Sequence, residues 1–104
     1  MADAKFIITQ SDVFIKEIPL DKEIVTIGRG WGNDVRIPYD SLSRMHAQVM
    51  RAGPNKYLIK DLASKNGTFV NDSKVREHRL KHKDRVTLGK YTLTFLLINA
   101  PGDS

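Results

Sequence analysis

Apolar residues along this chain recur in short runs that alternate with polar positions, the pattern of β-strands buried on one face. Turn residues separate the runs, and no window of useful length has the apolar spacing of a helix. We expect strands at 5–9, 13–18, 23–27, 34–37, 46–51, 57–60, 68–70, 74–75, 85–88 and 91–98. Short strands with frequent turns favour a β-sandwich or a barrel.

The chain length fits one domain, because 104 residues can bury a hydrophobic core without staples. We expect the domain to span 1–98 and residues 99–104 to begin a linker or tail of a longer protein. There is no cysteine, which excludes disulfides and thiolate chemistry. No apolar run could span a bilayer, and the first ten residues lack the features of a signal peptide. A cytoplasmic location is therefore expected.

Charge is unevenly distributed along the chain, whose formal net charge is +5. Residues 51–90 hold eleven Lys and Arg against four Asp and Glu, whereas the rest holds six against eight. A basic half favours an anionic partner, although charge alone does not identify its class.

The polar residues with the most chemistry lie in three segments between expected strands, at 28–29, 43–46 and 64–68. Loops from different strands gather at the ends of a sandwich, so these segments can converge on one site. They offer a planar guanidinium, a hydroxyl, two further cations and an amide, namely Arg29, Ser43, Arg44, Lys65 and Asn66. Each residue alone has a simpler interpretation as a solvated side chain or turn residue. Together, with no carboxylate among them, they fit a dianionic group attached to a peptide.

The same segments read GR (28–29), SRMHA (43–47) and SKNGTFVN (64–71). In order and spacing they resemble the three conserved blocks of forkhead-associated (FHA) domains, and residues 33–35 and 88–89 also resemble the family pattern. The resemblance extends from about Ile24 to Phe95. It implies an all-β fold, a β-sandwich of two antiparallel sheets with about eleven short strands. It also implies that the domain binds phosphothreonine and is not an enzyme.

The resemblance assigns a role to each matching residue. The resemblance implies that phosphate is bound by Arg29, Ser43, Arg44 and Lys65. Contacts with the peptide backbone fall to Asn66 and Asn71, and structural support of the site falls to Gly28, His46 and Gly67. The family often has glycine after the second asparagine, whereas this chain has Asp72, which makes the turn less permissive.

The implied partner is a protein that contains phosphothreonine, a substrate of a Ser/Thr kinase, or a segment of the same parent chain. No cofactor, metal or membrane is expected, and the isolated domain is expected to be a monomer. The methyl group of phosphothreonine is worth about 0.8 kcal/mol over phosphoserine, roughly fourfold in affinity. The resemblance places the methyl slot at 64–66, and the loop 38–42 and the region of Asn71 are candidates for reading flanking residues. The alternative is an FHA-like scaffold whose interactions do not depend on phosphate.

Three other functions have weaker support in the sequence. Ser43 and His46 could form a nucleophile and base, but residues three apart near a strand point to opposite faces. His78 and His82 have the spacing of metal ligands on a helix, yet their segment is basic and reads as a solvated loop. A basic stretch could attract nucleic acid, but it contains no aromatic residue on which bases could stack; it comprises Arg76, Arg79, Lys81, Lys83 and Arg85.

Trp31 follows the first conserved block and has two interpretations. It either contacts the ligand or covers an edge of the sandwich.

Overall fold

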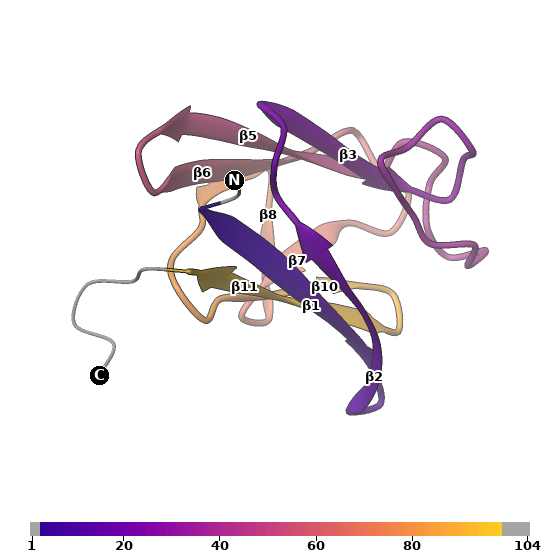
Figure 1. Ribbon diagram of the computed structural model, residues 1–104. Helices are drawn as coiled ribbons and strands as arrows, with labels where there is room; N and C mark the ends of the chain where they lie inside the picture. The colour runs from indigo at the N-terminus through magenta and orange to yellow at the C-terminus, as the bar shows by residue number, and fades with distance from the viewer. Residues whose placement is uncertain (1–2, 99–104) are drawn as a thin grey trace.

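The computed structural model describes residues 3–98, which form eleven β-strands and no helix (Figure 1). In chain order the strands are β1 (Ala4–Gln10), β2 (Val13–Pro19), β3 (Ile24–Gly28), β4 (Val35–Arg36), β5 (Ala47–Gly53), β6 (Lys56–Asp61), β7 (Thr68–Val70), β8 (Ser73–Val75), β9 (Glu77–Arg79), β10 (Arg85–Leu88) and β11 (Tyr91–Leu97). No helix in residues 3–98 is long and apolar enough to cross a membrane.

The strands form two sheets that pack against each other as a sandwich (Figure 1). The first sheet has the order β2-β1-β11-β10-β7-β8, and the second has the order β4-β3-β5-β6-β9. Neighbouring strands run antiparallel, except that β3 and β4 pair in parallel through Ile27–Val35 and Gly28–Arg36. The expected all-β sandwich and its number of strands are therefore confirmed. β2 and β4 are edge strands, one in each sheet.

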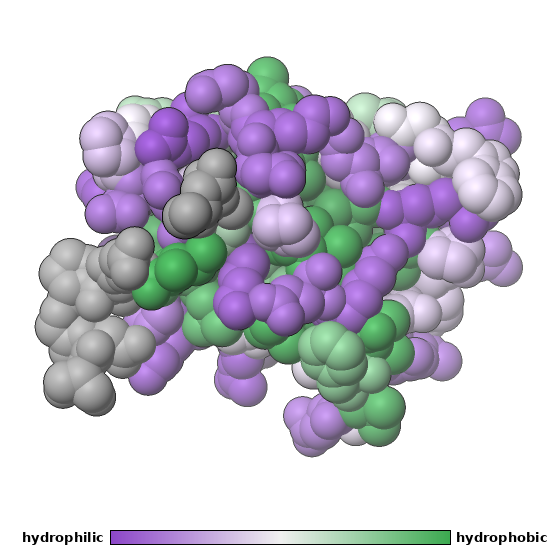
Figure 2. Space-filling view, in the orientation of Figure 1, coloured by the Kyte–Doolittle hydropathy of each residue, from purple (hydrophilic) through white to green (hydrophobic). Residues whose placement is uncertain are grey.

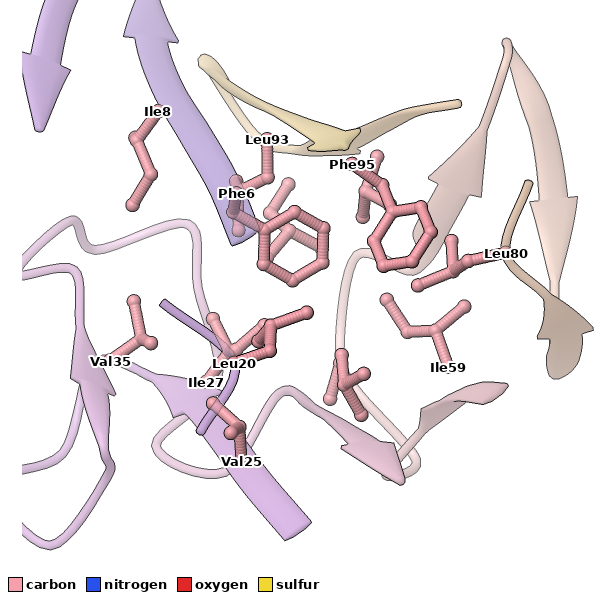
Figure 3. Packing of buried hydrophobic residues seen from close by; sticks show 14 of the residues in the cluster. Phe6, Ile8, Leu20, Val25, Ile27, Val35, Ile59, Leu80, Leu93 and Phe95 are labelled. Carbon is pink, nitrogen blue, oxygen red and sulfur yellow. The ribbon is translucent and has the colours of Figure 1, made fainter. Parts of the chain in front are cut away.

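The core lies between the two sheets and follows the alternation of apolar residues along the strands. Phe6 and Phe95 from the first sheet face Ile27 and Ile59 from the second, as Figure 3 shows. The ring of Phe95 meets the rings of Phe6 and Tyr57 edge to face, with centroids 5.9 and 5.5 Å apart. This close packing gives the loops a rigid base.

Two hairpins turn through two residues with positive φ and without glycine. The φ angles are 49° and 64° at Ser11 and Asp12, and 48° and 70° at Asn71 and Asp72. Positive φ at both central positions matches the twist of paired strands and is tolerated best by Asn, Asp and Gly. A turn therefore forms between the expected strands 5–9 and 13–18, and Asp72 adopts the conformation for which the family often has glycine.

The sequence did not predict β9, which pairs with the edge of β6. Its three residues, Glu77 to Arg79, are all polar, so no apolar alternation marks them. The strand forms because Leu58, Ile59 and Lys60 of β6 offer a free edge for pairing. The predicted tail, 99–104, lies outside the described residues.

Three loops that end strands of the second sheet meet at one end of the sandwich. They comprise residues 29–34 after β3, 37–46 after β4 and 62–67 after β6. Main-chain bonds join the first two, with Arg29 N–H donating to Ser43 O at 3.0 Å. The segments 28–29, 43–47 and 64–71, which resemble the family blocks, thus lie in or beside these loops.

Candidate functional site

Arg29 leaves the end of β3 and turns toward the loop before β5. Its Nε donates to Leu42 O at 3.1 Å, which fixes the half-buried side chain along its length. Its two terminal nitrogens make no hydrogen bond within residues 3–98. The guanidinium is therefore held in place with its fork of donors available to an anion.

His46 is fully buried and joins two loops of the site. Its Nδ1 accepts from Ser43 N–H at 3.1 Å, so Nε2 carries the proton and donates to Gly67 O at 2.8 Å. Ser43 Oγ accepts from Lys65 N–H at 2.9 Å, which leaves the hydroxyl proton free to point at a ligand. The imidazole binds the main chain of Ser43, so its Nδ1 is not placed to take a proton from the hydroxyl.

Asp61 organises the loop of residues 62–67 from the end of β6. Its carboxylate accepts from Ser64 Oγ–H at 2.5 Å, Ser64 N–H at 3.1 Å and Thr68 Oγ1–H at 2.7 Å. Burial raises the pKa of this carboxyl, but the hydrogen bonds from Ser64 and Thr68 outweigh burial and hold the pKa below its usual value. The loop is thus anchored by an ionised carboxylate whose oxygens accept from Ser64 and Thr68.

Asn66 and Gly67 occupy the tip of the same loop. Asn66 Nδ2 donates to Ser41 O at 2.8 Å, which fixes the plane of the amide, and its Oδ1 has no partner within residues 3–98. Gly67 has a φ of 91°, a conformation that residues with a Cβ rarely adopt. The stem of Lys74 lies directly over Gly67, which places a further cation beside the loop.

Gly28 is required because two stretches of main chain approach each other closely. A Cβ at Gly28 would overlap the carbonyl oxygen of Arg44. That oxygen accepts from Gly30 N–H at 3.1 Å and from Asn33 Nδ2 at 2.6 Å. The loop after β3 is therefore bound to the loop before β5, and Arg44 is carried to the side of Arg29.

A cavity of about 290 Å³ opens between these loops and is lined by arginines. Its lining consists of Arg29, Gly30, Trp31, Arg36 and Arg44, which we call the arginine cavity. Arg36 Nε donates to Arg29 O at 3.1 Å, and its guanidinium lies 3.5 Å from the centre of the Trp31 ring. Three positive charges line this space, and no carboxylate from residues 3–98 does, which suits a dianion.

Arg36 is the functional candidate that sequence reasoning missed. It follows Val35, which points into the core, so alternation in β4 places Arg36 on the opposite face. The parallel pairing with Gly28 then brings it beside Arg29. Trp31 is 84% exposed, and its ring lies against the guanidinium of Arg36 in the edge strand β4. Its contact with ligand stays a prediction.

Asn71 has contacts that the sequence did not reveal. Its Nδ2 donates to Asp84 Oδ1 at 2.9 Å, and its Oδ1 accepts from Arg85 N–H at 3.0 Å. These bonds tie the β7–β8 turn to the start of β10. The predicted contact of Asn71 with a peptide backbone stays a prediction.

The residues considered for a metal site and for a nucleic-acid site do not have the arrangement that either site needs. His78 lies in β9, not in a loop, and its Nε2 is 3.5 Å from Asp84 Oδ2. His82 Nδ1 accepts from Leu97 N–H, and no cluster of three metal-ligating residues occurs in residues 3–98. Lys83 lies in a turn with a φ of 74°, so Lys81, Lys83 and Arg85 do not share the face of one strand.

Comparisons with known proteins agree with this architecture. The family model described as FHA domain matches residues 25–89. A curated relative, the oxoglutarate dehydrogenase inhibitor of Corynebacterium jeikeium, is 35% identical over 77 residues, which is 74% of this chain and 53% of the relative. The chain spans about half the length of the curated relatives it matches.

Solved structures match the whole sandwich. A domain studied for phosphothreonine-dependent FHA domain interactions has a TM-score of 0.82 and 28% identity, with 90% of this chain and 95% of that chain covered. EmbR of Mycobacterium tuberculosis, solved with a low-affinity phosphopeptide, has a TM-score of 0.84 and 28% identity, with 93% of this chain and 25% of EmbR covered.

The fold and the cationic loops define a β-sandwich with an arginine-lined cavity at one end. The chain belongs to the FHA domain family.

Proposed function

We propose that this FHA domain binds phosphothreonine-containing segments of partner proteins and catalyses no reaction. The observation that carries the proposal is the arginine cavity, in which Arg29, Arg36 and Arg44 face one space that no carboxylate of the described part of the chain lines. Phosphothreonine at neutral pH is close to a dianion with three acceptor oxygens, which such donors match. The proposal is also supported by the family and by phosphopeptide binding in a structural neighbour.

Each residue has a task in this proposal. Arg29 binds the phosphate with the terminal nitrogens of its guanidinium, and Ser43 donates its hydroxyl proton to a phosphate oxygen. Arg44 and Lys65 contribute positive charge from the two neighbouring loops. Asn66 pairs with the main chain of the ligand through the Oδ1 that has no partner within residues 3–98.

The preference for threonine is assigned to a methyl slot at 64–66, with a gain of about 0.8 kcal/mol, or roughly fourfold, over phosphoserine. The partner is a kinase substrate or a segment of the parent chain, where high effective concentration makes a weak site sufficient. The cytoplasmic location expected from the sequence remains part of this proposal.

The test is a titration with an oriented library of phosphothreonine peptides, repeated without phosphate and with phosphoserine. We expect Arg29→Ala to weaken phosphopeptide binding at least about tenfold, because hydrogen bonds to charged groups are worth about 1.5–3 kcal/mol. Arg79→Ala in β9 is the matched control, since it removes the same charge from an exposed position outside the loops. We expect it to change the affinity less than about twofold.

Two outcomes would count against the proposal. Equal affinity for phosphorylated and unphosphorylated peptides would favour a scaffold that interacts without phosphate. Equal losses in Arg29→Ala and Arg79→Ala would indicate attraction by overall charge, without a defined phosphate site.

A further inference from the structure

A second cavity opens beside the arginine cavity, between the edge strands of the two sheets. Its volume is about 250 Å³. Ile15 and Lys16 of β2 form one wall, residues 36–38 form the other, and Ile8 and Tyr91 lie between them. We call this cavity the edge groove. It lies at the open side of the sandwich, because no further strand from residues 3–98 pairs beyond β2 or β4.

A β-bulge in β2 points an apolar side chain into the edge groove. Ile8 pairs with Lys16, whereas its neighbour Thr9 pairs with Phe14, so Ile15 is an extra residue in the strand. Consecutive residues of a regular strand point to opposite faces, but at this bulge both Ile15 and Lys16 line the groove. Bulges of this kind re-aim side chains and occur next to functional sites.

Apolar side chains remain exposed around this bulge. The exposed fractions of Val13, Phe14 and Ile15 are 62%, 59% and 44%. Figure 2 shows the resulting hydrophobic surface over the β2 end of the sandwich, surrounded by hydrophilic residues. A ligand that covers Ile15 would gain free energy from the apolar area it removes from water.

We propose that the edge groove binds an apolar side chain of the same partner whose phosphothreonine occupies the arginine cavity. This inference rests on the proposed function. Arg36 lines both cavities, so a ligand bound at Arg29 has the edge groove directly beside it. The bond from Arg36 Nε to Arg29 O and the contact with Trp31 hold this shared wall in place.

The charges at the groove further restrict which peptide sequences can bind there. Lys16 and Arg36 line it, and no acidic residue among the described ones does, so Lys or Arg next to the apolar residue of the ligand would be repelled. The ligand is therefore a phosphothreonine segment with a nearby Leu, Ile, Met or Phe that has neutral or acidic neighbours. A second copy of the chain fits less well, because a stable dimer buries roughly 1,200–2,000 Å² and the groove accommodates only one or two side chains.

The test compares Ile15→Asp with Val13→Asp. Both place a carboxylate at an exposed position of β2, but only residue 15 lines the edge groove. With wild-type protein we expect the phosphothreonine library to select an apolar residue at one flanking position. Ile15→Asp should lose that selection and bind the selected peptide about tenfold more weakly, whereas Val13→Asp should stay within about twofold.

Replacing the selected apolar residue of the peptide by alanine completes a double-mutant cycle. It should weaken binding to the wild type but have little further effect on Ile15→Asp. Urea unfolding of both variants checks that each remains folded. If the two variants bind with equal affinity and binding still depends on phosphate, the proposed ligand of the edge groove is wrong. The proposed phosphothreonine function is then unaffected.

Two further results would overturn the inference in other ways. If no phosphopeptide binds the folded wild type, both the function and the groove proposal fail. If sedimentation shows that the wild type is a dimer and Ile15→Asp is a monomer, the groove holds a second copy of the chain.

Discussion

At the scale of single residues, His46 and Asp61 hold the binding loops in position before any ligand arrives. His46 joins Ser43 to Gly67 through both ring nitrogens, and Asp61 accepts three hydrogen bonds from Ser64 and Thr68. Buried polar groups are stable only when they are paired, and here the pairing fixes one loop relative to another. The donors of the site are therefore preorganised, which lowers the entropy lost on binding.

Replacing Asp61 by asparagine should reduce the acid sensitivity of the domain. Hydrogen bonds lower the pKa of the Asp61 carboxyl in the folded protein. Its contribution to stability is therefore complete above the unfolded pKa, about 3.9, and is lost as pH falls through the lower folded pKa. Asp61→Asn should be less stable than wild type at pH 7, and the difference should shrink toward pH 3. Urea unfolding at several pH values measures this, and a constant difference would contradict it.

At the scale of elements, the site depends on how closely the end of β3 approaches the loop before β5. Gly28 lies against the carbonyl of Arg44, while Gly32, four residues later, has open space around it. The approach is possible because β3 pairs with both β4 and β5, which brings the ends of their loops together.

Gly28→Ala should therefore disrupt the site, and Gly32→Ala should not. The first substitution forces main chain apart, and overpacking of this kind costs about 1–3 kcal/mol. We also expect it to weaken phosphopeptide binding, because it displaces Arg29 from Arg44. At Gly32 the change should stay within about 0.5 kcal/mol or be slightly stabilising, since alanine restricts the unfolded chain. Urea unfolding and peptide titration of both variants test this, and similar losses in the two would refute it.

At the scale of the whole molecule, positive charge extends well beyond the arginine cavity. Residues 51–90 have seven more basic than acidic residues, and several lie on β8, β9 and the segments that flank them. Such a field attracts a phosphorylated segment before the specific contacts form.

Raising the ionic strength should slow phosphopeptide association and leave dissociation almost unchanged. Between about 50 and 500 mM salt the Debye length falls from roughly 14 to 4 Å, which screens the distant charges but not the close contacts of Arg29. We expect the association rate constant to fall several-fold, as measured by stopped-flow fluorescence of Trp31 or of a labelled peptide. A salt effect confined to the dissociation rate constant, with association unchanged, would contradict long-range attraction.

The sequence by itself determined the fold class and suggested most of the residues proposed for the site. Alternating apolar residues, such as those around Phe6 and Phe95, predict strands because successive side chains of an extended backbone point to opposite faces. Turn residues such as Ser11 and Asp12 act locally, so their effect can be read locally. The three segments at 28–29, 43–47 and 64–71 supplied most of the residues proposed to bind phosphate, because the chemistry of a phosphate ligand depends on residue type.

The tertiary structure alone decided the features that depend on partners distant in sequence. β9 has no apolar pattern and forms only because β6 offers an edge. Arg36 becomes part of the site through parallel pairing with Gly28, and Asn71 is tied to Asp84 and Arg85. The bulge that points Ile15 into the edge groove likewise depends on the register between β1 and β2. Local periodicity contains no information on pairing across such separations, because that pairing is settled by the packing of the whole sandwich.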